Sequence, residues 1–314
     1  MSTKNIVPRA DGEGSLGTAA KRWGNVQTKK VTSEGAVNAG SVTAGGITAT
    51  GEISGTTAEF TGAVNAGSVT AGGIDVANLL ASGAAAHNAI FRGKNLGSSV
   101  TPAQWAAIQA GTFDDLYIGD YWTINGIEWV IVAFDYYYNT GDTACTTHHV
   151  VVIPRTNLYD AQMNTGNVTT GAYVGSKMYT QNLNQAKTTI QNAFGASHLL
   201  SIRQNFQNAT TNGYESGGAW YDATVWLMSE ANVYGGNVFK SVINGTGWPN
   251  LYSIDNRQYP YFRFALPNEK RAWYWLRDVA ASSLFAVVDG SGISYSNDAS
   301  ASHGVRPAFC IKAS

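Results

Sequence analysis

The peptide GAVNAGSVTAGGI occurs twice without a change, at residues 35–47 and again at residues 62–74. The segment that contains both copies, residues 31–75, consists mainly of Gly, Ala, Ser and Thr, with single apolar residues spaced about five or six positions apart. This spacing is too wide for the alternation of a β-strand and does not match the 3.6-residue period of a helix. The apolar residues are Val31, Val37, Val42, Ile47, Ile53, Phe60, Val64, Val69 and Ile74.

One copy of such a segment cannot fold alone, because its sparse apolar side chains bury too little area to offset the entropy of ordering the chain. The segment is therefore either a flexible linker or a structure whose core several chains share. Regularly spaced repeats favour the second alternative. Three chains wound around one axis would each contribute a Val or Ile to every layer, and Gly would allow tight turns between layers. We therefore predict an intertwined, trimeric, β-rich fibrous shaft over residues 31–75, which the duplication lengthens.

Two short segments flank the predicted shaft. Residues 1–30 contain a literal G-x-G-x-x-G at Gly12–Gly17, but no strand pattern precedes it and no βαβ pattern follows, so a dinucleotide site is not expected. Residues 76–100, which contain a short helical pattern, are assigned to a collar or linker.

The rest of the chain, residues 101–314, holds every Tyr and every Trp except Trp23, which is enough for a globular core. Capping signals predict one helix that begins at Thr101-Pro102 and ends at Gly111. They predict a second, short helix after Ser229. A longer helix ends at Gly195. Its apolar face consists of Met178, Leu183, Ala186, Ile190 and Phe194.

Strand patterns alternate with these helices. Residues 120–135 predict a hairpin around the turn signal Asn125-Gly126, and residues 148–154 predict a further strand. More strand patterns follow residue 272. This mixture predicts an α+β domain with an early hairpin, central helices and a terminal meander.

Charge and hydropathy exclude several classes of function. The net charge is −1 and 13% of the residues are charged, which disfavours nucleic-acid binding because that needs a concentrated basic surface. The apolar runs at residues 128–134 and 148–154 are much shorter than the roughly 18 residues of a membrane helix. The first residues lack the pattern of a signal peptide, so we expect synthesis in the cytoplasm without use of the general secretory route.

No pattern indicates a metal, a cofactor or a catalytic centre, so we expect none. His148 and His149 are adjacent on a predicted strand, so their side chains should point to opposite faces and cannot share one ion. A glycosidase needs two carboxylates across a cleft, and no spacing favours a particular pair. The carboxylates considered are Asp114, Asp115, Glu128, Asp135, Asp222 and Asp278.

The two cysteines, Cys145 and Cys310, each adjoin a predicted strand. We expect both to be free and buried like small apolar residues. The alternative is a single disulfide that closes a long loop and stabilises the domain appreciably.

The strands after residue 272 constrain the packing. In WYWLRD, alternation places Trp273 and Trp275 in the core and the residues between them on the opposite face. In LFAVV, Phe285 and Val287 are the expected core residues, and the others face the opposite way. Asp289–Gly292 supplies the turn to a return strand or loop.

One arginine is expected to hold this region together. Arg306 precedes Pro307, which forces it into an extended conformation. We expect it to pair with Asp278 or with a backbone carbonyl.

The chain has more aromatic residues than a core of this size needs. Tyr and Trp give a large contact area at low entropic cost, so the surplus suits a binding face. The alternative places most of them in the core or between subunits. The residues concerned are Tyr136, Tyr137, Tyr138, Tyr214, Trp220, Tyr221, Trp248, Tyr259 and Tyr261.

Several of these stretches resemble one family. WYWLRD, a loose polar stretch and GVRPAF resemble the C-type-lectin-like domain of phage tail proteins, as does HHVVVIPRTNLYDAQMN in the middle of the domain. Separately, SLGTAAKRWGNV is similar to the virion-proximal end of many tail fibres, which implies that residues 1–30 form a virion-proximal attachment segment. The resemblance implies a C-type-lectin-like fold for residues 101–314.

In several members of this family, diversity-generating retroelements rewrite the terminal segment and leave a scaffold fixed. The resemblance makes WYWLR and GVRPAF the scaffold and implies that the receptor-binding positions lie between them. They are Ala280, Ala281, Ser283, Leu284, Ala286, Asp289, Ile293, Tyr295, Ser296, Asn297 and His303. The chain lacks the tripeptides of the calcium-dependent sugar-binding members and the cysteine motif of the formylglycine-generating enzymes, so neither activity is implied.

The resemblance implies a homotrimeric phage tail fibre receptor-binding protein in the virion, without enzymatic activity. Its N-terminus would bind phage tail or baseplate proteins, and its three C-terminal tips would bind a bacterial cell-surface receptor, protein or glycan, with avidity. Neither nucleic-acid binding nor membrane insertion is implied. The alternatives are a tailspike-type enzyme that degrades surface polysaccharide, a bacterial surface adhesin and a purely structural baseplate protein.

Overall fold

The structure, a computed structural model, describes residues 70–71, 74–75, 83–236, 238, 257–264 and 272–314. The predicted attachment segment lies outside these residues, and so does the predicted shaft except for two short strands. Strands β1 (Thr70–Ala71) and β2 (Ile74–Asp75) pair in antiparallel orientation. The trimeric shaft therefore stays a prediction.

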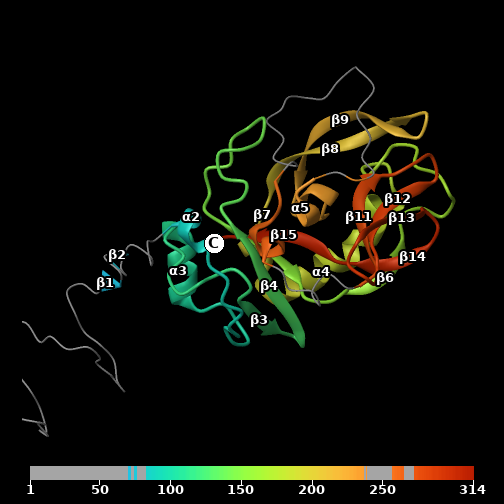
Figure 1. Ribbon diagram of the computed structural model, residues 1–314. Coiled ribbons are helices and arrows are strands. Elements are labelled where there is room, and N and C mark those ends of the chain that lie inside the picture. Colours follow the sequence, from blue (N-terminus) through green and yellow to red (C-terminus); the bar gives the residue numbers. More distant parts are fainter. Residues whose placement is uncertain (1–69, 72–73, 76–82, 237, 239–256, 265–271) are drawn as a thin grey trace, which may run out of the picture. The chain divides into compact units, whose positions relative to one another are not determined.

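Six strands form the larger sheet, in the order β10-β15-β5-β4-β3, with β7 also paired to β15 (Figure 1). They are β3 (Tyr121–Ile124), β4 (Ile127–Phe134), β5 (Val150–Pro154), β7 (Leu199–Leu200), β10 (Val225–Leu227) and β15 (Pro307–Ile311). The predicted early hairpin and the strand after it are confirmed. Asn125 and Gly126 have φ values of 54° and 77°, as a type I′ turn requires.

Five strands form a second sheet, in the order β13-β12-β11-β14-β6. They are β6 (Tyr159–Gln162), β11 (Tyr274–Val279), β12 (Leu284–Val288), β13 (Ser294–Asp298) and β14 (Ser302–Val305). The pair β11–β14 is parallel and the other pairs are antiparallel. The predicted terminal meander is confirmed for β11, β12 and β13, which Figure 1 shows together in orange to red. It was wrong for residues 302–311, because β14 pairs in parallel with β11 and β15 lies in the other sheet.

Arg306 alone separates β14 from β15, so the chain passes at this residue from one sheet to the other. Its Nε donates a hydrogen bond to the carbonyl oxygen of Pro154 at 2.9 Å, and its guanidinium lies over the Tyr274 ring, 5.3 Å from the centroid. Of the two expected partners, the backbone carbonyl is confirmed. The buried arginine therefore joins β5 of the first sheet to β11 of the second.

Seven helical segments connect these strands in the described residues. They are α2 (Ala84–His87), α3 (Pro102–Ala110), the π-helical η1 (Met178–Asn182), α4 (Leu183–Phe194), the 3₁₀-helical η2 (Ala196–His198), α5 (Glu230–Tyr234) and the 3₁₀-helical η4 (Pro260–Arg263). The described domain is thus a β-rich α+β fold.

The predicted helices are confirmed with their end signals. The Thr101 side chain caps α3 by accepting a hydrogen bond from the Gln104 amide at 3.2 Å, and Gly111 ends the helix with φ of 69°. Ser229 caps α5 in the same way, through the Asn232 amide. The predicted apolar face of the longest helix is buried along η1 and α4.

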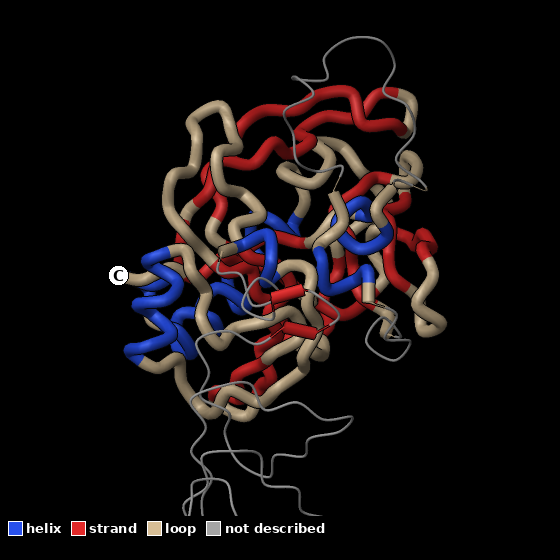
Figure 2. Tube along the Cα trace, turned by 60° about the vertical axis from the view of Figure 1, so that its left-hand side comes forward, coloured by secondary structure: helices blue, strands red, loops and turns tan. Residues whose placement is uncertain are grey.

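The longest hairpin of the described residues was not predicted. Strands β8 (Ile202–Thr211) and β9 (Tyr214–Ala223) form a separate two-stranded sheet, which lies along one side of the domain in both views (Figures 1 and 2). Asn212 and Gly213 form its turn, with φ values of 53° and 82°. This is the same turn dipeptide that marks the first hairpin.

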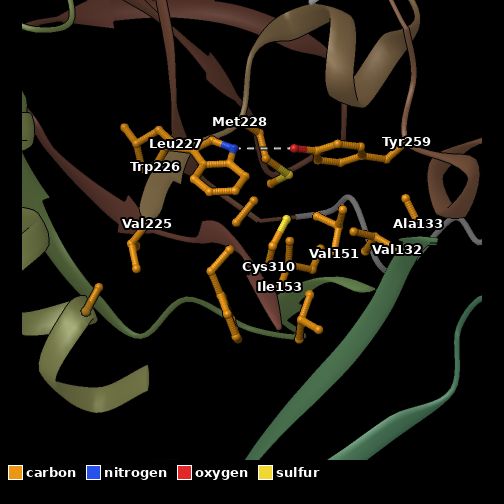
Figure 3. Close-up of a cluster of buried hydrophobic side chains, with 14 of the residues drawn as sticks. Val132, Ala133, Val151, Ile153, Val225, Trp226, Leu227, Met228, Tyr259 and Cys310 are labelled. Carbon is orange, nitrogen blue, oxygen red and sulfur yellow. Dashed lines mark hydrogen bonds between the residues drawn. The ribbon is translucent and has the colours of Figure 1, made fainter. Parts of the chain in front are cut away.

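Strands β4, β5, β10 and β15 contribute to a buried cluster that joins the sheet to the segment around Tyr259 (Figure 3). Trp226 of β10 donates its indole N–H to the Tyr259 hydroxyl at 3.4 Å. Cys310 lies buried in this cluster, and both cysteines are free. The expected free thiols are confirmed, although Cys145 is half-buried rather than fully buried.

The described part of the segment assigned to a collar, from Gly83 onward, packs against the domain. Phe91 and Leu96 contact its core. Arg92 Nη2 lies 2.7 Å from the buried carboxylate of Asp120. These residues therefore belong to the same packed unit as the residues after position 100.

Candidate binding site

An exposed group of apolar side chains lies at one end of the second sheet. Trp273 is 41% exposed, Ile293 58% and Tyr295 50%. His303 lies beside them and is half-buried. We call these four residues the aromatic platform.

Ring contacts hold the platform together. The Trp273 and His303 rings stack, with centroids 5.2 Å apart and planes 17° apart. The Tyr295 ring is perpendicular to the indole of Trp273, at 88° and 6.0 Å. Buried Trp275 supports His303 from below in an edge-to-face contact at 4.9 Å. His303 therefore covers one face of the indole, while Trp273 as a whole remains 41% exposed.

Strand register brings these residues to one face of the sheet. Trp275 of β11 and Tyr295 of β13 oppose the same residue of β12. Opposed side chains of an antiparallel pair share a face. Tyr274 of β11 is opposed to Gly304 of β14, so these two residues lie on the other face. Since faces alternate along a strand, Trp273 and His303, which precede them, lie on the same face as Trp275.

A tight turn places β13 beside Trp273. The Asp289 carboxylate accepts hydrogen bonds from the amides of Ser291 at 2.7 Å and Ile293 at 3.1 Å. Gly290 leaves room for the indole, since a Cβ there would lie 3.2 Å from Trp273 Nε1. The predicted turn at Asp289–Gly292 is thus confirmed.

The imidazole of His303 is held by stacking. Burial lowers its pKa, and the nearby Asp160 carboxylate opposes this shift. His303 is therefore mainly neutral near pH 7. Its Nε2 is buried and accepts or donates no hydrogen bond within the described residues.

The predicted receptor-binding positions are spread along the second sheet. Ile293, Tyr295 and His303 belong to the platform, and Asp289 holds its turn. Half-buried Ser296 and Asn297 lie on β13 at the edge of the sheet. Leu284 begins β12, and Ala280, Ala281 and Ser283 lie in the connection from β11 that precedes it. This end of the strand pair is about 17 Å from the Asp289 turn at 3.3 Å per residue. The structure therefore does not gather the predicted positions into one site.

Two of the packing predictions were wrong. Ala286 is fully buried, so it cannot contact a receptor in this structure. Trp273 was expected in the core and is exposed. Both faces of the sheet are covered at β12, since Ser294 Oγ donates to Glu230 of α5 at 2.6 Å on the Ala286 face. Strand alternation gives the face of a residue but does not say whether that face is covered.

Four of the eight surplus aromatic residues that the structure describes lie in the core, where the alternative interpretation places most of them. Tyr136, Tyr137, Tyr259 and Tyr261 are buried, so the binding-face interpretation was wrong for them. Tyr138, Trp220 and Tyr221 are half-buried, and Tyr214 is 46% exposed at the turn of the β8–β9 hairpin. Trp248 lies outside the described residues.

The two adjacent histidines precede β5, so the premise that they alternate on a strand was wrong. Both approach one carboxylate: His148 Nδ1 lies 2.6 Å and His149 Nδ1 3.8 Å from Asp135 oxygens. His149 donates from Nδ1 to the Thr147 carbonyl and accepts the Tyr137 amide at Nε2. Burial lowers its pKa, so the ring is neutral.

The carboxylates considered for catalysis have structural partners. Asp278 accepts the Glu230 amide at 2.6 Å where α5 begins. The others interact with Thr112 (Asp114), Arg92 (Asp115), Arg155 (Glu128), His148 (Asp135) and Arg203 (Asp222). In the part of the chain that the structure describes, no group of three or more His, Cys, Asp or Glu side chains is placed to hold a metal ion.

Trp273 is the platform residue that sequence reasoning assigned to the scaffold. Trp273 stands one residue before β11 begins, at the end of the sheet, and its side chain is exposed there. The sequence signal that could have indicated its position is Gly290, whose lack of a side chain makes room for the Trp273 ring.

Residues 166–313 match the model of a family described as a domain of unknown function, DUF6273. This stretch includes α4, the β8–β9 hairpin and all four platform residues. No curated protein and no solved structure significantly matches the chain. None of the helices in the described residues has the length and apolar character needed to cross a membrane.

Proposed function

We propose that the chain is a phage tail fibre receptor-binding protein whose C-terminal domain attaches the virion to a bacterial cell surface. The observation that carries the proposal is the aromatic platform. It exposes Trp273, Ile293 and Tyr295, and the latter two lie in the segment that the family resemblance marks for receptor binding.

Several features support this assignment over a structural role. A large apolar side chain exposed beside others of its kind marks a contact surface on a soluble protein. Trp and Tyr are enriched among the residues that dominate binding energy. A core-stabilising role would instead bury Trp273, as it buries its neighbour Trp275.

The proposed architecture includes a C-type-lectin-like tip and a trimeric shaft. Two features support the tip: an α+β arrangement, and a last strand, β15, that is interior to the larger sheet. The shaft is supported by the sparse, regular apolar residues of 31–75, which need companion chains. Trimerisation would let three weak sites act together.

Adsorption of the full-length chain to cells tests the proposal. The fluorescently labelled protein is mixed with a panel of bacterial strains, and bound label is counted by flow cytometry with unlabelled protein as competitor. We expect saturable binding to some strains and at least a tenfold loss for Trp273→Ala. Tyr214→Ala removes an equally exposed aromatic ring elsewhere and should bind like the wild type. Specific binding that Trp273→Ala leaves intact would contradict the assigned site.

Two further measurements address the architecture and the rival functions. Light scattering should give three chains per particle, and a stable monomer would contradict the shaft. New reducing ends from surface polysaccharide incubated with the protein would favour the tailspike alternative. A near-copy of the terminal segment beside a reverse transcriptase gene would establish diversification.

A further inference from the structure

We propose that the aromatic platform binds a neutral pyranose ring, which stacks on the exposed face of Trp273 without the help of a metal ion. The inference rests on the proposed function and specifies the chemical class of the receptor. It follows from the shape of the platform, its size and the polar groups around it.

The shape suits a flat ligand with one apolar face. His303 covers one face of the Trp273 indole, and the Tyr295 ring is perpendicular to it at 88°. The exposed indole and the perpendicular ring therefore offer two apolar surfaces at a right angle. The axial C–H groups of a pyranose carry partial positive charge, which the electron-rich face of an indole attracts.

The size favours a saccharide over a protein partner. A specific protein interface buries about 800 Å² on each partner. Here the platform exposes three apolar side chains, and the next residue of β13 on the same face is Asn297, which is small and polar. A ligand that needs one apolar contact and many hydrogen bonds fits this composition better.

The edge of the sheet supplies backbone groups for the hydroxyls. Asp289 N donates to Ile293 O at 3.0 Å and Ala299 N to Ser283 O at 2.9 Å. Hydrogen-bonded pairs alternate along an antiparallel ladder. The amide and carbonyl groups of Ser294 and Ser296 therefore point out of the sheet edge, on either side of Tyr295.

The charges near the platform favour a neutral sugar. The Asp289 carboxylate lies in the turn that packs against Trp273. The Asp160 carboxylate lies near enough to His303 to oppose in part the lowering of its pKa by burial. A phosphorylated or uronic sugar would be repelled by both carboxylates. Hydroxyl groups, by contrast, can donate to them.

Saturation-transfer NMR on the full-length protein tests this inference. The probes are the methyl glycosides of glucose, galactose, mannose and N-acetylglucosamine, with methyl glucuronide as the charged counterpart, each in the presence of excess EDTA. We expect transfer to at least one neutral glycoside, no transfer to the glucuronide, and no effect of EDTA. Trp273→Ala should lower the affinity at least tenfold, Trp273→Phe less, and Tyr214→Ala not at all. Circular dichroism checks that each variant is folded.

The outcomes separate this inference from the proposed function. Binding abolished by EDTA, binding preserved in folded Trp273→Ala, or preferred binding of the glucuronide would each overturn it. Absence of glycoside binding together with Trp273-dependent adsorption to cells would also overturn it, because the platform would then bind a receptor of another chemical class. If adsorption fails as well on every strain, the proposed function fails with it.

Discussion

The side-chain amide of Asn157 lies directly over the α-carbon of Gly304, so that a Cβ on this glycine would be 1.9 Å from Asn157 Nδ2. The same Nδ2 donates a hydrogen bond to the Trp273 carbonyl at 3.0 Å. Gly304→Ala must displace this amide and break its bond, so we expect a loss of about 1–3 kcal/mol in the free energy of unfolding. Urea denaturation measures it.

Two variants make this prediction specific. Gly166→Ala is the control, because a Cβ there meets nothing within 4 Å, and its stability should change by less than about 0.5 kcal/mol. Asn157→Ala should reduce the effect of Gly304→Ala when the two are combined. Strictly additive effects would show that the contact is not what excludes a side chain at Gly304.

The two type I′ turns should respond differently to the same substitution. Gly126 and Gly213 both have positive φ, 77° and 82°. A Cβ on Gly126 meets nothing within 4 Å, whereas one on Gly213 would lie 2.7 Å from the Ser282 amide nitrogen. Gly126→Ala should therefore lose only about 1 kcal/mol, from backbone strain, and Gly213→Ala about 2–3 kcal/mol. Equal losses in thermal unfolding would contradict the packing of the β8–β9 turn against the 281–283 turn.

Arg306 should not tolerate replacement by lysine. Its planar guanidinium both bonds to the Pro154 carbonyl and stacks over Tyr274, and an ammonium group cannot do both. We expect Arg306→Lys to destabilise the domain by about 2–4 kcal/mol, since it leaves buried groups poorly paired. Arg263→Lys, at an exposed arginine, is the matched control and should change little in chemical denaturation. A wild-type midpoint for Arg306→Lys would contradict the role given to this residue.

Stability should fall in mild acid through His149. Burial lowers its folded-state pKa below the ordinary value of 6.5, so the unfolded chain binds the proton more readily. Its contribution is fully present above pH 6.5 and is lost as the pH falls from there toward the folded-state pKa. His149→Gln should therefore be less stable at pH 8 but flatten the pH profile between about pH 7 and 5. His303→Gln provides the comparison, since burial lowers that pKa as well; an unchanged slope in His149→Gln would count against the assignment.

Local signals predicted much of the fold. Thr101 and Gly111 marked the ends of α3, and Asn125-Gly126 marked the first hairpin, because caps and turns depend on a few neighbouring residues. The β8–β9 hairpin carries the same Asn-Gly turn but was missed, since its strands are rich in Asn, Gln and Gly rather than β-branched residues.

The site was less predictable because it depends on which parts of each sheet face other elements of the fold bury. Alternation correctly grouped Trp273 with Trp275, yet only tertiary packing buries one and exposes the other. Ala286 was assigned to the surface because one face of the sheet was expected to be exposed to water. In the structure α5 packs against that face, and Ala286 is buried.

The order of the strands has a consequence for biosynthesis. Strand β15 is interior to one sheet and β14 joins β11 to β6 in the other, so neither sheet can close until residues 302–311 have left the ribosome. Until then the nascent domain exposes unpaired edges of β5 and β11, which are sites for misassociation. Assembly of the domain is therefore a late event, and any factor that protects the growing chain must act until Ile311 has emerged.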